Sequence, residues 1–285
     1  VPVSADSIAY TDLPAQAPAV LDPTPVTDST APAPTPDGVA AAVAEIITSP
    51  RLGSATSAVV LDPADGTVLF DYNGAAPRTP ASTLKVLSAL AAVQTLGPQT
   101  RLATRVVQGA DGGIVLVGGG DSTLALTDRG TPDTSGPDFA IQRATLSDLA
   151  DQTAAALTDA PVTLAYDASL FGAPYLSPDW SRADVASGAV GPVTALMVDG
   201  GRVSLDTEMR EKDPAAAAAT AFAALLAERG VTVTSISAGV APGGAAELAR
   251  VESAPIADLV TLDLTNSDND VTEALAHLAG AHASG

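Results

Sequence analysis

Residues 78–90 read RTPASTLKVLSAL, and within them Ser82 stands three positions before Lys85 in a largely apolar segment. Positions i and i+3 of a helix lie on the same face, so a helix here would bring the hydroxyl and the amine together. A serine hydroxyl is a weak nucleophile until a base removes its proton, and a deprotonated lysine can be that base. The structural alternative is a helix-capping serine and an exposed lysine. The tetrapeptide alone does not separate the two.

A second polar triplet, Ser267-Asp268-Asn269, lies in ADLVTLDLTNSDNDVTEALAHLAG (residues 257–280), where it interrupts two predicted helices. The hydroxyl can relay a proton, and the amide can hold a substrate carbonyl. The triplet can equally be a helix N-cap, since all three residue types favour that position. Together and in this order, the two motifs match two of the three motifs of serine penicillin-recognising enzymes, which is far more specific than either alone.

Composition excludes several other classes of function. The net charge is −20, from 33 acidic and 13 basic residues, which argues against a nucleic-acid-binding protein. The sequence has no cysteine and only two histidines, so neither a disulfide nor a thiolate metal site can form. We therefore expect no metal and no cofactor. No apolar run reaches the ~18–20 residues that cross a bilayer.

The pattern along the chain predicts a mixed α+β protein. Residues 1–37 are rich in Pro, Ala, Ser and Thr and are predicted to be a disordered tether or a plain disordered N-terminus. Helices are expected from Gly38, from Ser82 to Gly97, near 147–158 and from Asp213 to Gly230. Strands are expected at 57–62 and 67–72 as a hairpin, and singly at 102–107, 114–117, 162–166 and 231–237. A tight hairpin is predicted over 195–206, because Gly200-Gly201 tolerates a two-residue turn.

Several stretches resemble low-molecular-mass class C penicillin-binding proteins, the penicillin-binding protein 4-like D-alanyl-D-alanine carboxypeptidase/endopeptidase group, in an actinobacterial-type version. Beyond the two motifs they are LVGGGDSTL (116–124), YDASLFGAPYLSPDW (166–180) and VGPVTALMVDGGRVS (190–204). In the first, Ser122 stands where proline is usual. The resemblance covers about residues 40–280. Class A β-lactamases are a less good match, because their two motifs are much closer than the 185 positions between Ser82 and Ser267.

The resemblance implies a serine β-lactamase/DD-peptidase-like transpeptidase domain with a large α/β insertion between the Ser82 helix and the triplet. It predicts the tether at 1–37, the first part of the transpeptidase domain at 38–98, one or more inserted accessory lobes at 99–255 and the second, incomplete part at 256–285. Ser82 would attack a D-alanyl-D-alanine bond and Lys85 would accept its proton. Ser267 would protonate the leaving D-alanine, Asn269 would bind substrate, and Asp268 would border the substrate site while bracing its loop.

The expected partners are peptidoglycan stem peptides, with β-lactam antibiotics as inhibitors, outside the cytoplasmic membrane. The tether is compatible with membrane attachment through an N-terminal segment removed before Val1. His277 is interpreted as structural, and GGGD at 118–121 is not followed by the lysine of a phosphate-binding loop.

The third family motif, Lys-Thr/Ser-Gly, does not occur in residues 1–285. In similar enzymes it stands on a strand facing the nucleophile and helps to stabilise the oxyanion, where loss of one donor costs about 10²–10³ in rate. Two explanations stay open. The chain is a fragment of a longer peptidase, which we favour because both other motifs are intact, or it is a catalytically inactive homologue that binds the cell wall.

Overall fold

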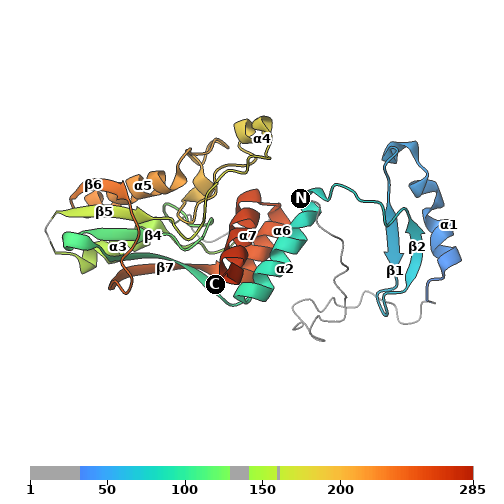
Figure 1. The fold of residues 1–285 in the computed structure, drawn as a ribbon, viewed down its shortest axis with the longest axis horizontal. Helices are drawn as coiled ribbons and strands as arrows, with labels where there is room; N and C mark the ends of the chain where they lie inside the picture. Colours follow the sequence, from blue (N-terminus) through green and yellow to red (C-terminus); the bar gives the residue numbers. More distant parts are fainter. Residues whose placement is uncertain (1–32, 129–140, 159–160, 285) are drawn as a thin grey trace. The chain divides into compact units, whose positions relative to one another are not determined.

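The computed structural model describes residues 33–128, 141–158 and 161–284, and these described residues fall into two compact units, divided between Thr79 and Pro80 (Figure 1). In the first unit, Thr35 caps a helix by accepting a hydrogen bond from the Gly38 N–H at 3.2 Å. A two-stranded antiparallel hairpin follows, as the sequence predicted, with Ala58 opposite Tyr72. Its elements are α1 (Pro36–Ile47), β1 (Ala58–Leu61) and β2 (Val68–Tyr72).

The second unit contains a five-stranded mixed sheet in the order β6-β5-β4-β3-β7. β4, β5 and β6 run parallel to one another, while β3 is antiparallel to both of its neighbours. The parallel strands are joined through helices, as such connections require. The elements of this sheet are β3 (Arg101–Gln108), β4 (Ile114–Val117), α3 (Leu146–Ala156), β5 (Val162–Asp167), α5 (Pro214–Glu228), β6 (Val233–Ala238) and β7 (Glu247–Pro255).

Two apolar clusters hold this unit together. In the first, α3 and α5 contact each other and the sheet, and Leu149 and Phe222 are buried in one cluster with Leu116. The second cluster joins α2 (Lys85–Leu96), α6 (Ile256–Asn266) and α7 (Asn269–Ser284), which pack side by side at one end of the sheet (Figure 1). The chain between β5 and α5, residues 168–213, contributes Phe171 and Met197 to this helical cluster. We call it the β5–α5 connection.

Most of the predicted elements are present within one to three residues of their expected ends, and the α+β class is confirmed by the mixed sheet and its helices. The hairpin predicted over residues 195–206 is wrong. Gly200 and Gly201 do have positive φ, but they belong to a 3-10 turn (Asp199–Gly201), and the residues before it are buried in the core instead of forming a strand. β7 and the short helix α4 (Arg182–Ser187) were not predicted from the sequence.

The predicted tether lies mostly outside the described residues, which begin at residue 33. Within the described parts of the chain, no helix combines the length and apolar character needed to cross a membrane. The predicted domain boundaries stay a prediction.

Candidate active site

Ser82 lies in a 3-10 turn (Ala81–Leu84) that leads directly into α2. Ala81 has a positive φ of 48°, which is uncommon for a residue with a Cβ and marks local strain beside the serine. The Ser82 side chain is exposed, whereas Lys85, on the first turn of α2, is only 7% exposed. The structure therefore contradicts the alternative of an exposed, solubilising lysine.

The two sequence motifs meet in space. The Ser267 hydroxyl donates to the Ser82 Oγ at 3.1 Å, and the Lys85 Nζ donates to the Asn269 Oδ1 at 2.6 Å. The Lys85 Nζ also lies 3.5 Å from the Ser82 Oγ, a long hydrogen bond. One hydroxyl thus has an amine on one side and a second hydroxyl on the other. This arrangement can remove a proton from Ser82 and deliver one to a leaving group.

The triplet forms the turn between α6 and α7. Ser267 has the left-handed conformation, φ 53°, and its N–H donates to the Asp263 carbonyl at the end of α6. The Asp268 Oδ1 accepts from the N–H groups of Asp270 and Val271, which satisfies the first turn of α7 as a helix cap does. Asp268 thus has the bracing role that the sequence suggested, and this carboxylate oxygen is occupied by the backbone.

Both polar atoms of the Asn269 amide have a hydrogen-bond partner. Its Oδ1 accepts from Lys85, and its Nδ2 donates to the Ala189 carbonyl at 2.8 Å. Ala189 belongs to the β5–α5 connection, so this loop borders the site. Sequence reasoning missed it, because a backbone carbonyl carries no residue-type signal.

A comparison with protein families decides the assignment. The model of the D-Ala-D-Ala carboxypeptidase 3 (S13) family matches residues 39–212 and 204–284. The chain belongs to this family. Membership of the S13 family confirms the resemblance inferred from the motifs.

Two curated relatives are similar over most of the chain. Carboxypeptidase DacB of Mycolicibacterium smegmatis is 38% identical over 269 residues, which are 92% of this chain and 56% of the relative. Carboxypeptidase Rv3627c of Mycobacterium tuberculosis is 36% identical over 256 residues, 88% of this chain and 53% of the relative. The chain therefore spans about half the length of the curated relatives it matches.

A solved structure shows the same fold. Penicillin-binding protein 4 (dacB) from Haemophilus influenzae superposes with a TM-score of 0.65 at 17% identity, covering 80% of this chain and 63% of that one. The same protein in complex with a β-lactam gives a TM-score of 0.54 at 18% identity, covering 77% and 60%. These two structures thus support the α+β fold class, while the S13 assignment rests on the family model and the curated relatives.

Asp263 is a buried carboxyl behind the site that sequence reasoning missed. Its side chain is fully buried, its Oδ1 accepts from the Thr272 hydroxyl at 2.6 Å, and its Oδ2 has no hydrogen-bond partner. Burial raises the pKa of Asp263 to about 6, and the nearby Asp268 adds to the rise, while Thr272 and Lys85 oppose it. The sequence did contain one indication of this buried carboxyl, because Asp263 directly follows Leu262 on the apolar face of α6.

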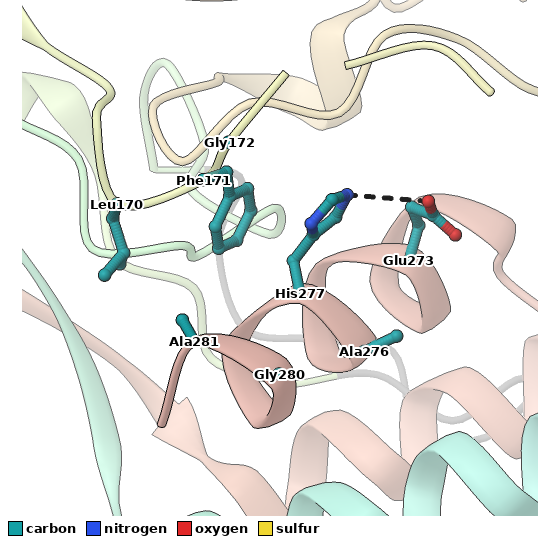
Figure 2. Close-up of a pocket in the computed structure, with 8 residues that line it drawn as sticks. All are labelled: Leu170, Phe171, Gly172, Glu273, Ala276, His277, Gly280 and Ala281. Carbon is teal, nitrogen blue, oxygen red and sulfur yellow. Dashed lines mark ion pairs between the residues drawn. The ribbon is translucent and has the colours of Figure 1, made fainter. Parts of the chain in front are cut away.

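A shallow pocket lies along the later turns of α7, lined by Phe171, Glu273 and His277 among others (Figure 2). The His277 ring stacks on Phe171 with centroids 4.9 Å apart, and its Nε2 lies 3.5 Å from the Glu273 Oε1. His277 follows Asn269 by eight residues, about 12 Å along the helix axis. His277 thus packs against an aromatic ring, which agrees with its interpretation as structural.

Proposed function

We propose that this protein is a serine DD-peptidase that cleaves D-alanyl-D-alanine bonds in peptidoglycan stem peptides through an acyl-enzyme at Ser82. The observation that carries the proposal is the Ser82 Oγ lying between the Lys85 amine and the Ser267 hydroxyl. Membership of the S13 family and the two carboxypeptidase relatives support the reaction class.

In the first half of the reaction, the Ser82 Oγ attacks the carbonyl carbon between the two D-alanines while Lys85 accepts the hydroxyl proton. The tetrahedral intermediate collapses by breaking its C–N bond. Ser267 passes a proton to the departing nitrogen and is reprotonated from Lys85. The products are free D-alanine and an ester on Ser82.

In the second half, a water molecule attacks the ester, giving up its proton to the same amine. The Ser82 oxygen leaves and is protonated, which releases the shortened peptide. Asn269 positions Lys85 through its Oδ1, at 2.6 Å from the amine. A β-lactam ring would acylate Ser82 in the same way and be released slowly.

We further propose that the rest of the substrate site, with the Lys-Thr/Ser-Gly motif, stands in polypeptide following residue 285. The chain spans only 56% and 53% of its two curated relatives, which supports this. Peptidoglycan as the substrate places the reaction outside the cytoplasmic membrane. Whether release of terminal D-alanine or cross-link cleavage dominates depends on that further part of the site.

Labelling with a fluorescent penicillin, followed by peptide mapping, tests the enzyme. A version extended beyond residue 285 should carry the label on Ser82, and residues 1–285 alone should be labelled slowly or not at all. Ser82→Ala should abolish labelling, whereas Ser88→Ala, on the first turn of α2, should not. Label on another serine, or an unlabelled extended protein, would defeat the proposal.

The alternative is a catalytically inactive homologue that binds the cell wall. It predicts co-sedimentation with purified peptidoglycan that survives Ser82→Ala and Lys85→Met, with no D-alanine release from the extended wild-type protein. Acyl transfer, in contrast, requires both side chains. The two hypotheses therefore give opposite results with the same pair of variants.

A further inference from the structure

A buried guanidinium joins the β5–α5 connection to helix α7. The Arg210 Nη1 lies 2.7 Å from the Asp270 Oδ2, and both side chains are almost fully enclosed, 8% and 6% exposed. The same Arg210 side chain donates from Nε to the Gly188 carbonyl at 3.2 Å and from Nη1 to the Gly200 carbonyl. One side chain thus holds three segments of chain. The proposed reaction does not use it directly.

Three glycines permit the close packing around Arg210 and its neighbour Glu208. A Cβ on Gly191 would lie 2.5 Å from the Arg210 Cγ, and a Cβ on Gly200 would lie 3.1 Å from its Nη1. Gly188 has φ 76°, and a Cβ there would meet the Glu208 carbonyl oxygen at 1.8 Å. Any larger residue at these positions would displace backbone or the arginine stem. The enclosure around Arg210 is therefore specific in shape as well as in charge.

Both ends of this clamp are next to the candidate active site. Asp270 directly follows Asn269, and Gly188 directly precedes Ala189, whose carbonyl accepts from the Asn269 Nδ2 at 2.8 Å. Arg210 thus holds the two chain segments that this hydrogen bond joins. If either segment moved, the Asn269 amide would rotate or shift, and its Oδ1 would leave the Lys85 amine.

We propose that Arg210 is a positioning residue that fixes the Asn269 amide between Ala189 and Lys85. The catalytic consequence rests on the proposed peptidase function, but the geometric consequence does not. Arginine suits the role because its planar fork reaches a carboxylate and two carbonyls at once, whereas a lysine ammonium is a single point donor on a flexible stem. A merely structural ion pair would affect the stability of the fold without moving Asn269.

The charge of Asp270 depends on this arginine. Burial raises the pKa of Asp270 to about 6, Asp268 adds to the rise, and the charges of Arg210 and Arg202 oppose it. A neutral residue at position 210 would therefore favour the protonated carboxyl. Arg210→Lys is the better test, because it keeps the charge and removes the fork.

The geometric test uses residues 1–285 and NMR of the Asn269 side-chain amide, assigned by its loss in Asn269→Asp. In Arg210→Lys we expect the amide resonances to move toward those of an asparagine without hydrogen-bond partners, and the order parameter of the side-chain amide to fall. Arg229→Lys is the matched control. Arg229 also bridges several groups, namely Asp151, Ser147 and the Leu225 carbonyl, but it does not touch α7.

The kinetic test uses the extended protein and penicillin acylation. Arg210→Lys should lower the acylation rate constant about 10–100-fold, because small displacements at a reacting centre are costly, and should change the initial binding constant much less. The acylation rate constant of Arg229→Lys should stay within about twofold of wild type, because this residue does not hold a group at the reacting centre.

The outcomes are separable. A folded Arg210→Lys variant with an unmoved Asn269 amide overturns the positioning role, whatever acylation does. A wild-type extended protein that is not acylated defeats the peptidase function, and the amide signal still decides the role of Arg210. If Arg210→Lys does not fold, Gly191→Ala provides the same test, because its Cβ would push the Arg210 stem while the charge remains.

Discussion

Asp263 shows how a single buried carboxyl can make stability depend on pH. Its side chain has no solvent exposure, and one of its oxygens has no hydrogen-bond donor. Burial raises the pKa of Asp263 from 3.8 to about 6. Between these values the folded state binds more protons than the unfolded state. The free energy of unfolding from this group is therefore highest below about pH 4 and falls as the pH rises through 6.

Replacing Asp263 with asparagine should remove this dependence. The amide keeps an acceptor for the Thr272 hydroxyl but carries no charge. Relative to wild type, Asp263→Asn should gain on the order of 2 kcal/mol in free energy of unfolding between pH 4 and pH 7.5. Urea unfolding at a series of pH values measures it.

Asp151→Asn is the control with the opposite sign. The hydrogen bond from Arg229 lowers the pKa of Asp151, so its contribution to stability is present at neutral pH and is lost in acid. Asp151→Asn should therefore lose stability relative to wild type as the pH rises. Parallel curves for Asp263→Asn and wild type would show that the pKa of Asp263 is the same in the folded and unfolded states, and would remove the basis of the prediction.

The residues predicted to form the site do come together. Ser82 with Lys85, and Ser267 with Asn269, are local pairs whose spacing is visible in the sequence. Their catalytic roles stay a prediction. The partners of Asn269 and Asp263 were not predictable in the same way. Asn269 contacts the backbone of Ala189, 80 positions away, and the isolation of the Asp263 Oδ2 is a property of the packed core.

Helix α7 depends on the cap that Asp268 supplies. The Asp268 Oδ1 accepts from two N–H groups of the first turn of α7, a helix that packs on both α2 and α6. Asp268→Ala should lower the free energy of unfolding by about 1 kcal/mol relative to Asp268→Asn, since asparagine caps as well as aspartate does. Comparing these two variants cancels the change in charge.

Thermal or urea unfolding measures the difference in free energy of unfolding between Asp268→Ala and Asp268→Asn. A role limited to bracing predicts that Asp268→Asn retains penicillin acylation in the extended protein. If Asp268→Asn were as stable as wild type but no longer acylated, Asp268 would belong to the substrate site, the other role that the sequence analysis gave it.

The segment after β4 runs so close to the backbone of β3 that a Cβ has no room at Gly119. A Cβ on Gly119 would lie 2.1 Å from the Ala103 carbonyl oxygen of β3, which is backbone and cannot rotate away. Gly119→Ala should therefore lower the free energy of unfolding by about 3 kcal/mol or more, the upper range for overpacking. Gly172→Ala is the control, because a Cβ there would meet nothing within 4 Å. Equal stability of the two variants would contradict the close approach.

Long-range pairing explains which elements escaped prediction. β3, β4, β5 and α5 carry their own local patterns and were predicted. β7 pairs with β3 across at least 140 positions, and its sequence, ELARVESAP, follows a Gly-rich loop and alternates only partly. Gly200-Gly201 did predict positive φ angles, but these occur in a 3-10 turn and not in a hairpin. There the absence of a Cβ on Gly200 leaves room for Arg210 and Asp270.

In residues 80–285, helix α2 buries one face and leaves another uncovered. Lys85, Ala89 and Ala92 are buried, where α2 packs on α6 and α7. The opposite face carries Leu84, Val86, Leu87 and Leu90, each between 50% and 61% exposed, at helical spacing. Contiguous apolar surface of this kind on a soluble protein marks a contact site or a tendency to associate.

We therefore expect residues 80–285 to bind a hydrophobic dye and to self-associate as concentration rises. Leu87→Gln with Leu90→Gln should reduce dye fluorescence several-fold and shift the sedimentation profile toward monomer. The free energy of unfolding should change by less than about 1 kcal/mol, because neither side chain is in the core. Met209→Gln, at an apolar residue that is 64% exposed and lies outside α2, is the control and should change dye binding much less. If the double variant bound dye like wild type, the uncovered face of α2 would not be the adhesive surface.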